Sequence, residues 1–330
     1  MDSQGVNSRA TELFSILALQ ILTGEDMNSI PGSDSMSVAN QFNTLCKNLK
    51  VPQSTRSTIS NRYKGITQRL NIDFWKIKDN KKHSLYVGSY ARGTAVKGFS
   101  DLDIIFILPH DLYDKYNSYQ SKGQSALLQS VKKSLQLTYP TTDIGGDGQV
   151  VVIQFADGIK FEVVPVFEGN DSSFIYPDSN NGGSWKTTNP RPEIETIRDN
   201  NKLMNGNLIN LCRMARAWKK KWNVPMGGLL IDTLCNNFLK SWKYNDKSYS
   251  YYHLMSSDFL KYLSNQKQNQ KYWHAVGSKQ RIYRNRKGNF EYKAKQCYKI
   301  ALEAIKYQSR KMNPSAKKKW IEIYGTSFPG

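Results

Sequence analysis

The sequence predicts a mixed α/β lobe followed by a helical lobe, an α+β fold with a cleft between its two parts. Apolar runs of strand length, rich in valine and isoleucine, lie between residues 84 and 167. From about residue 193 onward, apolar residues recur mainly at helical spacing. A chain of 330 residues is long enough for two packed lobes. We therefore expect N-terminal helices and a sheet lobe over residues 1–192, and a helical lobe over residues 193–330.

Apolar spacing and turn residues predict helices before the sheet, over residues 8–23, 37–50 and 55–78, with a polar loop at 24–36. Ser54 is placed to cap the third of these helices. That helix also carries a row of basic side chains, which predicts an exposed basic rod: Arg56, Arg62, Lys64 and Arg69.

Strands are predicted from short apolar runs at residues 84–87, 102–108, 150–155 and 161–167. The last two should form a hairpin around the turn Asp157-Gly158. A helix is expected over 121–137, and residues 169–192 are expected to be a polar loop. The remaining helices are predicted at 195–222, 227–242, 256–266 and 293–310. Residues 267–292 are basic and aromatic, and the pattern leaves their structure open.

The charge of the chain is segregated. Residues 1–200 have no net charge, whereas residues 201–330 hold 26 basic and 6 acidic side chains and so carry the whole net charge of +20. Within the neutral part, residues 51–100 carry a net charge of +8. Such segregation favours a polyanionic partner, nucleic acid or nucleotide polyphosphates first. The alternative is a lysine-rich surface that only serves solubility.

The lengths of the apolar stretches and the spacing of the cysteines argue against a membrane-spanning, secreted or disulfide-rich protein. No apolar run approaches the roughly 18 residues that cross a bilayer, and no leader-like segment opens the chain. The four cysteines are scattered and form no C-x-x-C pair, so the sequence indicates neither a disulfide framework nor a zinc knuckle. We therefore expect a cytoplasmic protein with reduced thiols and no membrane partner.

One constellation of residues points to chemistry. A strand leads into Gly88-Ser89, where backbone N–H groups and a hydroxyl can bind a phosphate. Asp101 and Asp103 are two positions apart at the start of a strand, so both carboxylates share a face. Glu162 interrupts an apolar strand, where a charge needs a reason. Three acids of this kind are suited to Mg²⁺, with Mn²⁺ as an alternative, and to phosphoryl transfer.

The order GSYARGT, DLDIIF and FEVVP resembles the DNA polymerase β-type nucleotidyltransferase superfamily, and more narrowly the bacterial CD-NTases, which are cGAS/DncV-like enzymes. The stretches SWKTTNPR, RMARAWKKKW and AKKKWIEIYGTSFP extend the likeness from about residue 55 to residue 329. The resemblance implies a two-lobed fold and Mg²⁺-dependent synthesis of cyclic di- or trinucleotides from nucleoside triphosphates, ATP and GTP first. It also implies a role in the antiphage systems called CBASS, in which the product activates a separate effector.

The resemblance also assigns roles to single residues. Gly88 and Ser89 match the phosphate-binding turn, and Asp101, Asp103 and Glu162 match the metal-binding acids. Arg216 falls where relatives carry a basic residue that reaches the donor triphosphate, and Arg213 or Lys219 could share that work. Two departures stand out: Gly227-Gly228-Leu229 lies where relatives often carry Ser-Tyr, and the third acid is Glu rather than Asp.

The excess basic charge predicts a polyanion bound on a surface away from the cleft, and the resemblance implies that this ligand is structured RNA that activates the enzyme. Its candidate contacts are Arg56, Arg62, Lys64, Arg69, Arg281, Arg284 and Arg286. Two alternatives to a cyclic nucleotide synthase stay open: a primer-dependent RNA or tRNA nucleotidyltransferase, and a catalytically silent nucleic-acid-binding module.

Overall fold

The structure is a computed structural model that describes residues 37–98, 101–285 and 288–330, and these belong to one compact unit. The predicted helix over 8–23, the predicted loop over 24–36 and Arg286 lie outside the described residues. None of the helices in the described part of the chain is long and apolar enough to cross a membrane.

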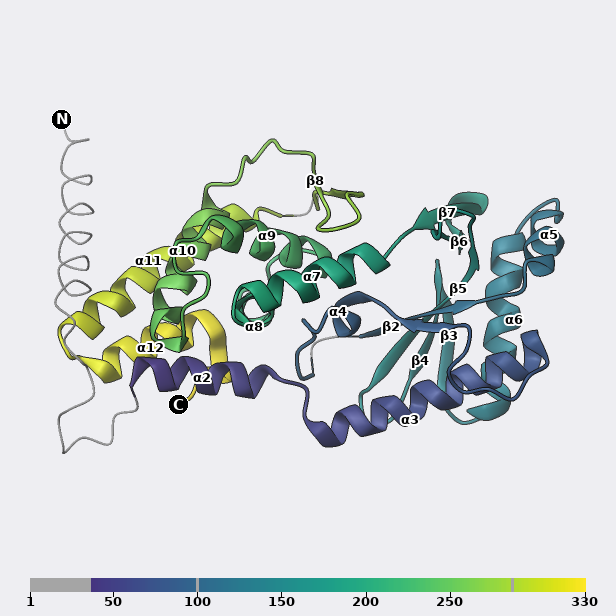
Figure 1. Ribbon diagram of the computed structural model, residues 1–330, viewed down its shortest axis with the longest axis horizontal. Helices are drawn as coiled ribbons and strands as arrows, with labels where there is room; N and C mark the ends of the chain where they lie inside the picture. Colours follow the sequence, from purple (N-terminus) through teal and green to yellow (C-terminus); the bar gives the residue numbers. More distant parts are fainter. Residues whose placement is uncertain (1–36, 99–100, 286–287) are drawn as a thin grey trace. The chain divides into compact units, whose positions relative to one another are not determined.

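A mixed sheet forms one half of the molecule (Figure 1). Its strands run in the order β1 (Ser84–Tyr86), β2 (Leu102–Ile107), β5 (Lys160–Glu168), β4 (Val150–Gln154) and β3 (Asp143–Asp147). Strands β2 and β5 are parallel, and the other neighbours are antiparallel. The predicted hairpin around Asp157-Gly158 is confirmed as β4 and β5. A mixed sheet combined with helices confirms the predicted fold class.

Two helices, α3 (Gln53–Leu70) and α6 (Gly123–Thr138), cover one face of this sheet (Figure 1). Ile66 of α3 and Val131 of α6 are fully buried there against Ile104 of β2 and its neighbours. A shorter helix, α5 (Asp111–Asn117), precedes α6. Because side chains alternate along a strand, the residues on either side of Ile104 point to the opposite face. That face carries Asp103 and also a smaller buried apolar cluster that contains Ile105 and Val166.

Helices form the other half: α7 (Arg191–Leu203), α8 (Asn207–Lys221), α9 (Gly228–Ser241), α10 (Tyr252–Ser264), α11 (Phe290–Ser309) and α12 (Asn313–Tyr324). The sequence groups the helix α2 (Val38–Leu49) with the sheet lobe, but α2 packs on α8 and α10 instead. Phe42 of α2 is fully buried, with its ring centroid 5.1 Å from Trp320 and 5.4 Å from Phe328.

Two predicted helices differ in extent. The helix expected over 55–78 begins at Gln53 with Pro52 as its N-cap, so Ser54 is not the cap. It gives way after Leu70 to a π-helical turn, and Lys76 then adopts a left-handed conformation with φ 58°. The helix expected over 195–222 is two helices, because Asn205 and Gly206 have positive φ values of 51° and 81° and turn the chain between α7 and α8.

Two segments without predicted elements contain hairpins. The expected polar loop over 169–192 holds β6 (Phe174–Asp178) and β7 (Ser184–Thr188), and β6 pairs with β5. The apolar run of β6 is only three residues long, Phe174 to Tyr176, and β7 is mostly polar, so neither has the longer apolar run from which strands are predicted. Within residues 267–292, β8 (Tyr272–His274) pairs with β9 (Arg281–Tyr283).

Candidate active site

The structure brings the three predicted acids together on neighbouring strands. Asp103 of β2 lies directly opposite Glu162 of β5 in the parallel register. Both side chains point away from the face covered by α3 and α6, because the residues beside them, Ile104 and Val163, belong to that core. Asp101 immediately precedes β2 and extends the same row. The sheet therefore positions all three carboxylates at one place.

The electrostatics of this acidic row are unusual. Burial, and then the negative charges of Glu162 and Asp101, raise the pKa of Asp103 from 3.8 to about 6, although Arg92 acts in the opposite direction. The ammonium group of Lys160 stands 2.9 Å from Oδ2 of Asp101 and 2.8 Å from Oε1 of Glu162. Three carboxylates are thus close together, and the single positive charge of Lys160 offsets only part of their negative charge.

The donor chemistry fits Mg²⁺ or Mn²⁺, because carboxylate oxygens are the ligands that these hard cations prefer. The arrangement itself is not preassembled: among the described residues, no three His, Cys, Asp or Glu side chains are grouped closely enough to hold a metal ion as they stand. The raised pKa of Asp103 is the effect expected of acids that a cation would stabilise.

The predicted phosphate-binding turn abuts the acids. Gly88 opens the short helix α4 (Gly88–Ala91) with a φ of +61°, and a Cβ there would lie 1.8 Å from Oδ2 of Asp103. Only glycine therefore fits at this position. The turn is closed by the carbonyl of Ser89, which accepts hydrogen bonds from the N–H groups of Thr94 at 2.9 Å and Ala95 at 3.0 Å.

A cavity of about 590 Å³ connects this turn to the helical half. Its sheet-side wall contains Gly88, Ser89, Arg92, Asp101 and Asp103. Its helical wall contains Arg216, Lys219, Lys220, Asn223 and Gly228. Glu162 is not in the lining, although it neighbours Asp103 in the sheet. An anionic ligand in this cavity would meet backbone N–H groups on one side and cations on the other.

The three basic residues predicted to bind triphosphate occupy different environments. Arg216 is buried, and its two terminal nitrogens donate to Asp232 at 2.6 and 2.9 Å. Arg213 donates to the carbonyls of Gly93 and Ala95, and so holds in place the segment that follows the phosphate-binding turn. Of the three, only Lys219 has a side chain that makes no hydrogen bond or ion pair with a described residue. Burial, and then the charge of Arg216, lower its pKa.

Sequence reasoning missed a buried charge network behind the cleft. Arg92 donates from Nε to Asp232 at 2.9 Å, and Thr94 donates its hydroxyl to the same oxygen at 3.0 Å. Arg92 also forms an ion pair with Glu193 at 3.5 Å. Although burial opposes ionisation, Arg216 and Arg92 lower the pKa of Asp232 to about 2. The signal was present in the sequence, because an aspartate in the apolar run GLLIDTLC needs a charged partner.

The predicted nucleic-acid contacts on α3 divide into two groups. Arg56 and Lys64 are exposed. Arg62 is paired with Asp157 at 2.9 Å, and Arg69 is paired with Asp73. The prediction of an exposed basic rod is therefore wrong for Arg62 and Arg69, whose side chains are only 22% and 21% exposed and are paired with acids from the turn between β4 and β5 and from the π-helical turn after α3.

The contacts predicted near residue 280 divide in the same way. Arg281 is exposed, with its guanidinium carbon 4.6 Å from the ring centroid of Tyr272. Arg284 is half-buried and donates to the buried Glu291 at 2.7 Å and to the carbonyl of Gln270. Arg284 therefore holds the hairpin against α11, a structural task that the sequence did not predict.

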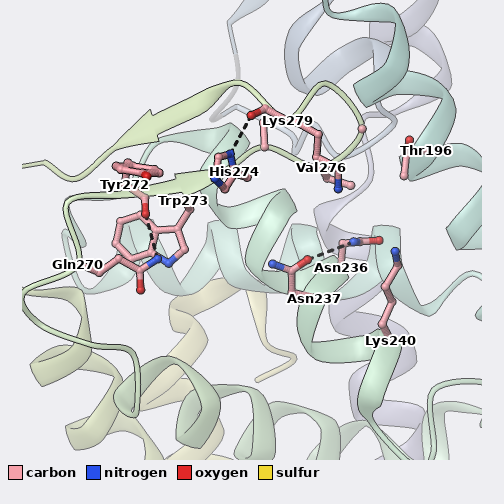
Figure 2. Close-up of a pocket in the computed structure, with 12 residues that line it drawn as sticks. Thr196, Asn236, Asn237, Lys240, Gln270, Tyr272, Trp273, His274, Val276 and Lys279 are labelled. Atoms are coloured by element: carbon pink, nitrogen blue, oxygen red, sulfur yellow. Dashed lines mark hydrogen bonds between the residues drawn. The ribbon is translucent and has the colours of Figure 1, made fainter.

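A second cavity of about 480 Å³ lies between α9 and the β8–β9 hairpin (Figure 2). Figure 2 shows Asn236, Asn237 and Lys240 on the α9 side, with Trp273 and His274 on the hairpin side. Among the residues that the structure describes, no carboxylate lines this cavity. The acidic cleft is therefore the candidate active site.

Comparisons with known proteins identify the family to which the chain belongs. The model of the SMODS family, the Second Messenger Oligonucleotide or Dinucleotide Synthetase domain, matches residues 36–201. A probable cyclic nucleotide synthase of Bacillus cereus (strain VD146) is 21% identical over 283 residues, which cover 75% of this chain and 82% of the relative. The cyclic AMP-AMP-AMP synthase of Acinetobacter sp. (strain ATCC 27244 / 9458) is 23% identical over 197 residues, 56% of this chain and about half, 53%, of the relative.

The fold has solved counterparts. CdnC of E. coli MS115-1, determined in a complex with HORMA-deltaN, superposes with a TM-score of 0.66 at 15% identity. The match covers 88% of this chain and 98% of CdnC. The likeness therefore extends over both the sheet and the helical half.

Proposed function

The chain belongs to the SMODS family of bacterial CD-NTases, and from this premise we propose that it joins nucleoside triphosphates into a cyclic di- or trinucleotide second messenger. The observation that carries the proposal is the register of Asp103 opposite Glu162, directly beside the glycine turn at the wall of the cleft. Phosphoryl transfer needs this combination of an acidic metal site and a phosphate-binding turn.

In the proposed reaction, a ribose hydroxyl oxygen attacks the α-phosphorus of a nucleoside triphosphate, and pyrophosphate leaves. For a trinucleotide the linear product is extended once more in the same way. The ring closes when a ribose hydroxyl of the linear product attacks the α-phosphorus of its own 5′-triphosphate, and pyrophosphate leaves again. Ser89 and the backbone N–H groups of its turn bind the donor phosphates, and Lys219 reaches them from the helical wall. Glu162 accepts the proton of the attacking hydroxyl.

Asp101, Asp103 and Glu162 would hold Mg²⁺ or Mn²⁺, which when bound neutralises charge on the phosphoryl oxygens. ATP and GTP are the substrates we expect first. Gly227-Gly228 leaves the beginning of α9 without a hydroxyl or ring, so the donor base stacks on another group or is held less tightly.

The test is incubation of the purified protein with radiolabelled ATP and GTP, singly and mixed, with Mg²⁺ and no primer. Product that resists phosphatase and is absent from Asp103→Asn and Glu162→Gln variants supports the proposal, provided both variants stay folded. Product that appears only as an extension of added RNA favours a primer-dependent nucleotidyltransferase. Absence of pyrophosphate release under every condition favours a silent nucleic-acid-binding module.

We further propose that structured RNA activates the enzyme and that its product serves antiphage defence by switching on a separate effector. Support for the RNA ligand comes from the basic charge that the cleft does not use, with Arg56, Lys64 and Arg281 exposed. A duplex would be bound through its phosphates and shape rather than its base edges.

A further inference from the structure

The ammonium group of Lys160 lies between two of the candidate metal-binding carboxylates. Lys160 begins β5 two positions before Glu162, so both side chains point to the same face of the sheet. In the parallel register Leu102 pairs with Phe161, which brings Asp101 opposite Lys160. The nitrogen therefore reaches Asp101 across the sheet, at 2.9 Å, and Glu162 along its own strand, at 2.8 Å.

This lysine offsets a local excess of negative charge. Asp101, Asp103 and Glu162 bring three carboxylates to one face, an arrangement that is unfavourable unless a cation lies among them. The ammonium group of Lys160 contacts both Asp101 and Glu162 and so supplies a positive charge between them. A metal ion would bind the same oxygen atoms, and an ammonium group and a metal ion cannot both contact them.

We propose that Lys160 is an internal cation that occupies the space between Asp101 and Glu162 in the nucleotide-free protein, and that it must withdraw before a metal ion binds there. The proposal rests on the metal-dependent nucleotidyl transfer proposed above. The side chain of Lys160 is 28% exposed on a flexible stem, so it can swing into solvent.

Competition of this kind couples metal binding to nucleotide binding. A metal ion alone gains only the carboxylates, from which it must displace the ammonium group. A metal ion that arrives with a nucleoside triphosphate keeps phosphate oxygens as additional ligands, and the lysine is displaced more readily. The acids would therefore stay largely metal-free until substrate is present.

The first test measures binding of Mn²⁺ without nucleotide. The electron paramagnetic resonance signal of free Mn²⁺ reports how much of the ion remains unbound. Lys160→Met keeps the length of the side chain but not its charge, and should bind Mn²⁺ about tenfold more tightly than the wild type, which corresponds to about 1.4 kcal/mol. Lys160→Arg keeps the charge and should not gain affinity. With a non-hydrolysable ATP analogue present, the wild type should approach Lys160→Met.

Lys319 provides a matched control. Its ammonium group also bridges two carboxylates, at 2.9 Å from Glu303 and 3.2 Å from Glu322, and its side chain is 25% exposed. Lys319→Met should bind Mn²⁺ like the wild type. Unchanged or weaker Mn²⁺ binding by Lys160→Met, relative to Lys319→Met, would overturn the proposal.

If Lys160→Met does not fold, acetylation of the wild-type protein gives a second test. Saturating Mn²⁺ should increase the acetylation of Lys160, read by mass spectrometry, and leave the acetylation of Lys319 unchanged; no increase at Lys160 overturns the proposal.

Failure of the underlying function looks different, because wild type and Asp103→Asn would then bind Mn²⁺ and the ATP analogue equally and no cyclic product would form. If cyclic product forms but the lysine tests fail, only the role of Lys160 is wrong.

Discussion

Arg92 and Asp232 are 140 residues apart in the sequence, yet the Nε of Arg92 donates a 2.9 Å hydrogen bond to Oδ2 of Asp232. Arg92 directly follows α4, which carries the phosphate-binding turn, and Asp232 lies in α9. Arg216 of α8 contacts both oxygens of the same carboxylate. The two walls of the cleft are thus joined through one buried acid.

Asp232→Asn should destabilise the protein by about 3–5 kcal/mol, because it leaves the buried guanidinium group of Arg216 without its counter-charge and Arg92 with only the longer 3.5 Å contact to Glu193. Urea denaturation measures this loss. The control is Asp199→Asn, which breaks an exposed pair with Arg198 and should cost about 0–1 kcal/mol. Equal unfolding free energies for the two variants would show that the buried network does not hold the walls together.

The raised pKa of Asp103 predicts a pH dependence of stability in EDTA. Between its ordinary value of 3.8 and its folded value of about 6, the folded protein binds more protons at this site than the unfolded chain. The contribution of Asp103 to the unfolding free energy should therefore fall as the pH rises from about 4 to about 6, by up to about 3 kcal/mol.

The measurement for Asp103 is the difference in unfolding free energy between wild type and Asp103→Asn across this pH range. Glu162→Gln should reduce the pH-dependent difference, because the charge of Glu162 contributes to the raised pKa. A difference that does not vary with pH would mean that Asp103 titrates normally.

Lys219→Met should lower kcat/KM for the nucleoside triphosphate by about 10- to 100-fold, the range expected for one hydrogen bond between charged groups. Ser89→Ala, which removes a neutral hydroxyl, should lose less. Lys221→Met is the matched control, since Lys221 ends the same helix but does not line the cleft. If steady-state kinetics give Lys219→Met the same kcat/KM as the wild type, then Arg216 rather than Lys219 contacts the triphosphate.

The double variant Arg56→Glu/Lys64→Glu should weaken binding of double-stranded RNA and reduce the slope of log K against log salt by about 1 for each phosphate that the variant no longer binds. Lys115→Glu/Lys133→Glu makes the same change in net charge at exposed positions on α5 and α6. RNA binding and product formation are measured together in both variants. If both pairs weaken binding equally, net charge rather than α3 is responsible.

The spacing of apolar residues along the sequence predicts the helices and strands that depend on neighbouring residues. The apolar run around Asp103 predicts β2, and the period of two along a strand predicts that Asp101 and Asp103 share a face. The partner of a charged residue is different, because it comes from the tertiary fold. Nothing near Arg62 in sequence indicates Asp157, 95 residues away, as its ion-pair partner.

For the same reason, the position of Arg216 on a cleft-facing helix could be predicted but its engagement with Asp232 could not. Lys160 is a further example. From the sequence alone, Lys160 is a residue beside the predicted hairpin turn. Its contact with Asp101 depends on the pairing of β2 with β5, which the sequence does not predict.

The packing of α2 has a consequence for the order in which the enzyme is built during translation. Asn48 donates a 3.0 Å hydrogen bond to the carbonyl of Ser327, and Phe42 packs against Phe328. Ser327 lies 279 residues after Asn48, so α2 leaves the ribosome long before these partners have been synthesised. The helical wall is completed only after Phe328 has been synthesised. Because α2 packs on the helical half, that half cannot take its final form in a nascent chain, and the cleft can enclose nucleotides only once the last of these residues has been added.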